Sequence, residues 1–86
     1  EMEEVEVGRI SHYFSKIQVG VGKITSGGLK VGDVVHIKGH SSDFFQKIES
    51  MQIEHQPVEE AGAGEEVAFK VDFPVRENDV IYKVVE

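Results

Sequence analysis

The stretch VGVGKITSGGLKVGDVVHIKG, residues 19–39, decides how the rest of this chain is organised. Its two ends are rich in valine and isoleucine, which favour strands over helix. Between them, residues 26–28 and 29–33 contain glycines that allow the chain to reverse in tight corners. Two such corners within so few residues are typical of a small closed barrel and not of a flat sheet.

The first strand of this stretch is expected to turn its valines inward. Val19 and Val21 are predicted to face the core, and the glycines that alternate with them leave room on the other face for another backbone. Ile24 is one step out of phase with the valines, because side chains alternate with a period of two along a strand. A β-bulge near Gly22 or Lys23 would restore its facing toward the core.

Length and composition limit what the chain can be. Its 86 residues make one domain, residues 1–86, of which residues 1–4 are expected to be frayed. There is no cysteine, which excludes disulfides, thiolate nucleophiles and cysteine metal sites. No apolar run is long enough for a membrane helix or a signal-peptide core, so we expect a cytoplasmic protein with no membrane partner.

The chain is strongly acidic, with a formal net charge of −7 from 16 acidic and 9 basic residues. Much of the acid lies in residues 1–6 and 59–66, which are interpreted as a solvated end and a solvated loop. Binding to a phosphate backbone needs a positive surface, so RNA binding would require a local basic patch or the help of a partner.

The remaining segments also indicate strands. Apolar and polar residues alternate in residues 4–7 and 65–71, and a bulge at Gly8 would explain a phase shift in the first of these. Residues 80–85 are predicted to form the closing strand. Residues 44–55 contain spacings that fit either a helix face or a strand, and we favour a strand because no helix cap precedes them. Residues 58–61 are predicted to form a short helical turn. The consistent fold class is all-β, a small closed or nearly closed six-stranded antiparallel β-barrel.

Several motifs in this order resemble a known domain: GxLKVGDxV at residues 27–35, ESMQIEH at 49–55, VEEA at 58–61, AGEEV at 63–67 and VRENDV at 75–80. Together they look like domain 2, the β-barrel domain, of the translational GTPases, as in elongation factor Tu and its archaeal and eukaryotic counterparts. The chain also resembles small stand-alone proteins termed translation elongation factor-like. Asn78 replaces the glycine of the family's closing turn.

The resemblance implies no GTP chemistry and no cofactor, because a Gly-x-x-x-x-Gly-Lys-Ser/Thr phosphate loop is missing. In the aminoacyl-tRNA carriers, domain 2 forms a shallow pocket for the tRNA end. The matching positions are Gln52, His55 and Glu66, where the carriers place a glutamate, an arginine and an asparagine. All three residue types differ here, and Glu66 adds negative charge, so carrier-type aminoacyl-tRNA binding is disfavoured.

Catalysis and metal binding are both predicted to be absent. His36 and His40 are four apart, about 13 Å along a strand, which is too far for one ion unless Gly39 makes a sharp turn. Residues 11–12 and 41–43 contain catalytic residue types, but nothing positions a nucleophile against a base. We therefore expect a protein that is not an enzyme.

Surface binding is the remaining hypothesis. Basic residues beside an aromatic side chain form a plausible platform for a nucleotide or for an unpaired base. The candidate RNA- or partner-binding residues are Arg9, Tyr13, Lys16, Lys23 and Lys30. The alternative places the aromatic side chains in the core and scatters the lysines over the surface. A third possibility is pairing of an exposed strand edge with a partner.

From these observations we predict a non-catalytic binding module. The main hypothesis is an accessory of the translation apparatus that contacts the ribosome, a tRNA end or a translation factor. The alternative is a protein-interaction module that serves an unrelated enzyme and makes no contact with RNA, and the net charge of −7 suits a basic protein partner.

Overall fold

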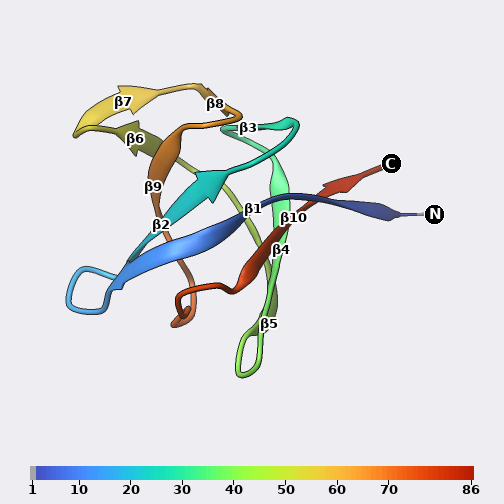
Figure 1. Ribbon diagram of the computed structural model, residues 1–86, viewed down its shortest axis with the longest axis horizontal. Coiled ribbons are helices and arrows are strands. Elements are labelled where there is room, and N and C mark those ends of the chain that lie inside the picture. The colour runs from blue at the N-terminus through green and yellow to red at the C-terminus, as the bar shows by residue number, and fades with distance from the viewer. Residues whose placement is uncertain (1) are drawn as a thin grey trace.

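The structure is a computed structural model that describes residues 2–86, and Figure 1 shows it as a chain of strands joined by short turns. Within these residues there are ten strands and no helix. The strands are β1 (Glu3–Phe14), β2 (Val19–Ile24), β3 (Gly28–Lys30), β4 (Val34–Lys38), β5 (Asp43–Lys47), β6 (Met51–Ile53), β7 (Gln56–Val58), β8 (Glu60–Gly62), β9 (Glu66–Lys70) and β10 (Val80–Val85).

The strands pair antiparallel throughout, which confirms the all-β prediction. Eight of them form one sheet in the order β5-β4-β10-β1-β2-β9-β6-β7, and β3 pairs with β8 in a second, two-stranded sheet. The six-stranded barrel is not confirmed. The large sheet has eight strands, and in residues 2–86 no ladder joins its end strands β5 and β7. The extra strands come from short segments, such as β7 and β8, that alternate over too few residues to be recognised as strands.

The central strand β1 carries two register shifts, one against each neighbour. Against β10 the shift lies between Glu6 and Gly8, which agrees with the bulge predicted at Gly8. Against β2 it lies between Ile10 and His12, so the bulge predicted near Gly22 or Lys23 is in the partner strand instead. Glu3 and Glu4, expected to be frayed, pair with β10, and Glu1 lies outside the described residues.

The facing predicted for β2 is wrong. The glycines at 20 and 22 are buried together with Ile24, whereas Val19 and Val21 are only half-buried on the opposite face. A Cβ atom on Gly22 would lie 2.7 Å from Cδ1 of Ile81. The glycines therefore make room for core side chains of other strands, and Ile24 needs no bulge to point inward.

The core is one cluster inside the curved sheet, and β3 and β8 contribute to it. Its buried members are Val7, Ile10, Ile24, Leu29, Val35, Ile37, Ile48, Met51, Ala61, Val67, Phe69, Val71, Val75 and Ile81. The set confirms the inward face predicted for residues 67, 69 and 71.

Three predicted corners are confirmed by their backbone angles. Gly27 and Gly32 have φ of 64° and 99°, and Asn78, which replaces glycine, has φ of 76°. Asp33 closes the second corner, because its backbone N–H donates to the Lys30 carbonyl at 3.0 Å and its carboxylate accepts from the Lys30 N–H at 2.8 Å.

The two doubtful segments have different outcomes. Residues 44–55 contain β5 and β6 with no helix, as we favoured. The helical turn predicted for residues 58–61 is wrong, because these residues end β7 and begin β8. Pro57 lies in β7 at the end of the sheet order, where its missing N–H costs no ladder bond.

Candidate functional site

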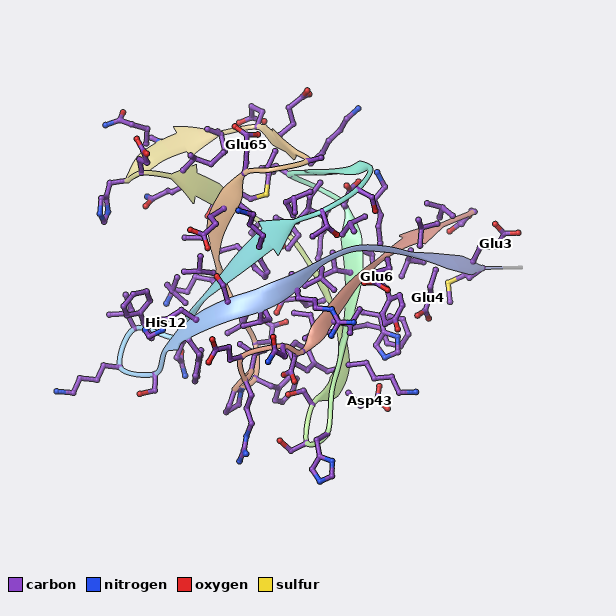
Figure 2. All side chains as sticks on the ribbon, in the orientation of Figure 1. Glu3, Glu4, Glu6, His12, Asp43 and Glu65 are labelled. Carbon is purple, nitrogen blue, oxygen red and sulfur yellow. The ribbon has the colours of Figure 1, made fainter. Side chains whose placement is uncertain are left out.

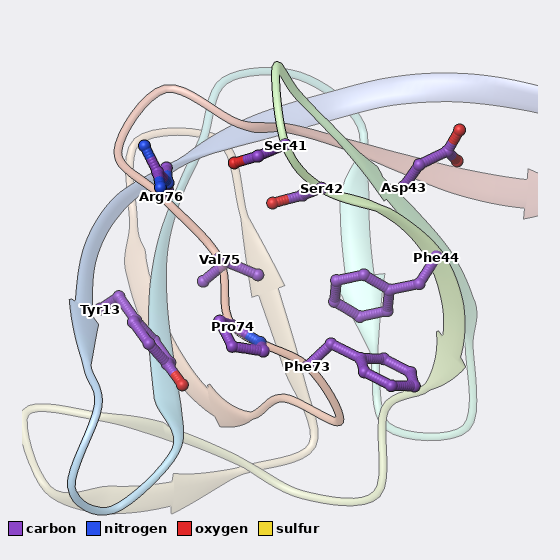
Figure 3. Close-up of a pocket in the computed structure, with 9 residues that line it drawn as sticks. All are labelled: Tyr13, Ser41, Ser42, Asp43, Phe44, Phe73, Pro74, Val75 and Arg76. Atoms are coloured by element: carbon purple, nitrogen blue, oxygen red, sulfur yellow. The ribbon is translucent and has the colours of Figure 1, made fainter.

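A groove of about 720 Å³ opens between the β4–β5 turn and the segment that leads into β10 (Figure 3). Its lining comes from three parts of the chain that are far apart in sequence. The lining residues are Tyr13, Ser41, Ser42, Asp43, Phe44, Phe73, Pro74, Val75 and Arg76. A groove of this size with an apolar lining and few polar groups is the usual form of a binding site.

Aromatic side chains dominate one part of the groove. Phe44, from β5, and Phe73, from the segment after β9, meet edge to face with their ring centroids 5.2 Å apart. Phe73 nevertheless leaves 57% of its surface exposed, although its ring is large and apolar. Tyr13 lies on the opposite wall in Figure 3, with Pro74 between. This arrangement exposes apolar surface to a ligand while one ring supports the other.

Polar groups surround the other end of the groove, and the buried Asp79 organises them. Its carboxylate accepts hydrogen bonds from Ser42 Oγ at 2.6 Å and from the backbone N–H of Arg76 at 2.9 Å. Gly39 packs so closely on Asp79 that a Cβ atom there would overlap the carboxylate. Asp79 therefore ties the β4–β5 turn to the turn before β10 and fixes this end of the groove.

The Arg76 guanidinium is free of carboxylates, since no ion pair joins it to any residue within 2–86. Its side chain extends along the same end of the groove as Ser41 and Ser42 (Figure 3). A guanidinium is always charged and presents its donors in a planar fork that matches a carboxylate. This end of the groove can therefore hold an anionic group.

His36 lies next to the groove and is held from two sides. Its Nδ1 is 2.7 Å from Glu4 Oε1 and its Nε2 is 2.6 Å from Asp43 Oδ1. Its ring stacks on Phe45 with centroids 4.1 Å apart. Figure 2 labels both carboxylate partners, which come from β1 and β5 and meet His36 on β4.

Burial of the His36 ring opposes its charged form, but hydrogen bonds from the ring to the Asp43 and Glu4 carboxylates outweigh this and raise the pKa of His36 above 6.5. The hydrogen bond from His36 in turn lowers the pKa of Asp43 below 3.8. Because an ionised carboxylate only accepts, both contacts are hydrogen bonds when the imidazole is protonated and both ring nitrogens donate. Because the two nitrogens face different carboxylates, one metal ion cannot bind this group, and no cluster of three potential ligands occurs among residues 2–86.

The sequence-predicted basic residues are distributed over several surfaces. Arg9 and Lys23 are opposite one another in the β1–β2 ladder, and Arg9 approaches Glu6 at 3.9 Å. Tyr13 lines the groove, Lys23 lines a second hollow, and Lys30 lines a third beside Lys83. Lys16 is in the turn between β1 and β2 and lines none of these three hollows.

The positions that matched the tRNA-end pocket do come together. Gln52, His55 and Glu66 line the second hollow of about 560 Å³, together with Lys23. Two further carboxylates, from Glu54 and Glu65, also line it, so its charge is mainly negative. A negative hollow disfavours a nucleotide end.

Two serines of residues 11–12 and 41–43, the segments with catalytic residue types, donate hydrogen bonds to other groups. Ser11 Oγ donates to the Val21 carbonyl at 3.2 Å, and Ser42 Oγ donates to Asp79. The imidazole of His36 contacts two carboxylates. No serine is hydrogen-bonded to a histidine in the described part of the chain.

Sequence reasoning missed most of the groove, including Phe44, Phe73, Pro74 and Arg76. The one available signal was the run Phe-Pro-Val-Arg after β9, in which an aromatic, a proline and a cation follow a strand end. Such runs also occur in ordinary turns, so the run alone does not indicate a site.

Comparisons with known proteins point to proteases. An uncharacterized protease of Methanocaldococcus jannaschii is 34% identical over 84 residues, which is 96% of this chain and 20% of that protein. A collagenase of Porphyromonas gingivalis is 34% identical over 82 residues, 94% of this chain and 20% of that protein. The chain thus spans about a fifth of the length of the curated relatives it matches. No family model matches the chain.

These comparisons overturn the predicted membership in the elongation factor domain. Elongation factor 1-alpha of Pyrococcus horikoshii does match, at 38% identity, but over 66 residues and 72% of this chain. The protease matches extend over nearly the whole chain. The translation role is therefore withdrawn with the resemblance that implied it.

A solved structure agrees with the protease matches. The C-terminal domain of a candidate U32 peptidase of Geobacillus thermoleovorans superposes with a TM-score of 0.84, at 23% sequence identity, over 93% of this chain and 91% of that domain. Among residues 2–86 there is no helix of the length and apolarity needed to cross a membrane. The chain therefore has the fold of the C-terminal domain of that peptidase.

Proposed function

We propose that this chain is a non-catalytic binding module that works with a peptidase of the U32 type and contacts protein, not RNA. The observation that carries the proposal is the match to two proteases over 94% or more of this chain but only about a fifth of their length. A segment of that share is one module among others. The likeness to the C-terminal domain of a peptidase, whose structure was solved as a separate domain, also supports a separate module.

The chemistry of the described side chains supports a binding role. Ser11, Ser42 and His36 form structural hydrogen bonds, and no serine–histidine hydrogen bond occurs among residues 2–86. The groove instead offers the exposed ring of Phe73, with the half-buried rings of Tyr13 and Phe44, beside the Arg76 guanidinium, which has no ion pair among residues 2–86. Aromatic side chains and arginine are the residue types that contribute most to recognition at protein interfaces. The net charge of −7 likewise opposes a nucleic-acid partner.

Affinity capture tests this proposal. The tagged chain is used to retain partners from an extract of its own source, treated with nuclease and washed at physiological salt. We expect a polypeptide with peptidase activity to be retained in stoichiometric amount, while the purified chain alone cleaves neither gelatin nor fluorogenic peptides. Retention of ribosomal components that disappear after nuclease treatment, or peptide cleavage by the chain itself, would contradict the proposal. The expected cytoplasmic location is part of the same proposal and can be measured by fractionating the same cells.

A further inference from the structure

The groove described above has two chemically different ends. Phe44 and Phe73 form its apolar end, and Arg76 with Ser41 forms its polar end (Figure 3). Among residues 2–86, Arg76 and Asp43 are the only charged residues that line it, and Asp43 is hydrogen-bonded to His36. Asp79 also lies at the polar end, but it is buried beneath the surface and its carboxylate accepts hydrogen bonds from Ser42 Oγ and the Arg76 backbone N–H. The exposed charge without an ion pair that a ligand meets is therefore the positive charge of Arg76. A ligand with an anion next to an apolar group would complement both ends.

The polar end of the groove is bounded by two turns that meet there. Ser42 and Arg76 are joined through the buried Asp79, and Gly39 packs directly on its carboxylate. The β4–β5 turn and the turn before β10 are thus held together at this end. A chain that passed through the groove would have to continue over these joined turns, whereas a chain that ends in the groove would not.

From these two observations we infer that the groove binds the C-terminal end of a peptide whose last side chain is apolar. The terminal carboxylate pairs with the Arg76 guanidinium and accepts a hydrogen bond from Ser41 Oγ. The last side chain packs among Tyr13, Phe44 and Phe73. This inference rests on the proposed function, because a module that serves a peptidase meets peptide ends, and it names the chemical class that the groove recognises.

The probes are three N-acetylated pentapeptides, and binding is measured by calorimetry and by the chemical shifts of the chain. The first, Ac-Gly-Gly-Ala-Pro-Phe, has a free carboxylate. The second is its C-terminal amide. The third is an amide with aspartate in the fourth position, which offers a carboxylate inside the chain instead of at its end. We expect the free acid to bind about tenfold or more tightly than either amide, because a charge-assisted bidentate pair is lost without the terminal carboxylate.

Variants locate the binding. Arg76→Gln should weaken binding of the free acid about tenfold or more and remove its preference over the amide. Lys47 is an exposed residue of β5 that does not line the groove. Lys47→Gln removes one positive charge there and should leave the affinity within about twofold of the original. Phe73→Ala should weaken the free acid and the amide to a similar extent, since it removes apolar contact common to both.

The comparison between the three peptides uses the unaltered protein, so it does not depend on a variant that folds. Equal binding of the acid and the amide, equal binding of the internal aspartate peptide, or no binding at millimolar peptide would each overturn the inference. None of these results would change the outcome of the affinity-capture experiment, which tests the proposed function. Failure of the inference and failure of the proposed function therefore remain distinguishable.

Discussion

The side chain of Gln46 on β5 and the backbone of Asp72 form a two-point bridge across an edge of the sheet that no ladder closes. The Asp72 N–H donates to Gln46 Oε1 at 2.8 Å, and Gln46 Nε2 donates to the neighbouring Lys70 carbonyl at 2.9 Å. Gln46 keeps only 7% of its surface exposed. One amide therefore replaces the strand pairing that is missing between β5 and the end of β9, and it holds the backbone that leads into Phe73.

Replacing Gln46 with alanine should destabilise the fold by about 1–3 kcal/mol, because two part-buried hydrogen bonds, to the Asp72 N–H and to the Lys70 carbonyl, are lost. Urea unfolding followed by circular dichroism measures the change. Gln52→Ala, at an exposed position on β6, is the matched control and should stay within about 0.5 kcal/mol of the original. Equal stabilities for the two variants would show that the bridge contributes nothing.

Gly22→Ala should cost about 1–3 kcal/mol, because the new methyl group would overlap Cδ1 of Ile81 in a filled core. Ile81→Val removes that same atom. The cost of the alanine should therefore be clearly smaller when it is introduced into the Ile81→Val protein, and a double-mutant cycle of unfolding free energies measures the difference. An additive cycle would contradict the contact.

Gly32 is in open space with a φ of 99°, so a side chain there is opposed by backbone conformation and not by crowding. Gly32→Val should destabilise the protein by more than about 1 kcal/mol, since β-branched residues are strained at positive φ. Gly32→Asn should be better tolerated, because asparagine enters this region more readily. If both variants melt at the temperature of the original protein, the corner does not depend on this angle.

The contacts of His36 with Glu4 and Asp43, together termed the His36 clamp, predict a dependence of stability on pH. The pKa of His36 is raised in the folded state by Asp43 and Glu4, against the effect of its burial. The contribution of the protonated ring is thus fully present below the unfolded pKa and is lost as pH rises through the folded pKa. We expect the unfolding free energy to fall as pH increases above about 6.5, with a shallower fall in His36→Gln.

Nuclear magnetic resonance provides the direct measurement for the clamp. The ring proton of His36 should titrate with a midpoint above 6.5, and Glu4→Gln should lower that midpoint because one of the two stabilising carboxylates is gone. A midpoint below 6.5 in the original protein would mean that burial of the ring outweighs both carboxylates. Lys16→Gln, a change in the exposed turn between β1 and β2, is the control for general charge effects.

Local chemistry predicted much of the fold. Residues 67, 69 and 71 alternate with polar neighbours and are buried, and the closing strand agrees with its predicted bounds, Val80–Val85. The corners at Gly27, Gly32 and Asn78 were predictable because few residue types accept positive φ. Much less of the candidate site could be predicted from the sequence. Of its lining, only Tyr13 was singled out as a binding residue, and the basic residues named with it lie on other surfaces.

The sequence by itself determined that this protein consists of antiparallel strands with glycine corners, because alternation and φ preferences act over a few neighbouring residues. Only the tertiary structure decided which face of β2 is buried, because that depends on Ile81 from the opposite end of the chain filling the space at Gly22. It also decided the groove. Phe44 and Phe73 meet, and Ser42 reaches Asp79, only after the sheet has curved and brought distant turns together. Contacts of that kind depend on packing across the whole domain, and no local pattern of residues encodes them.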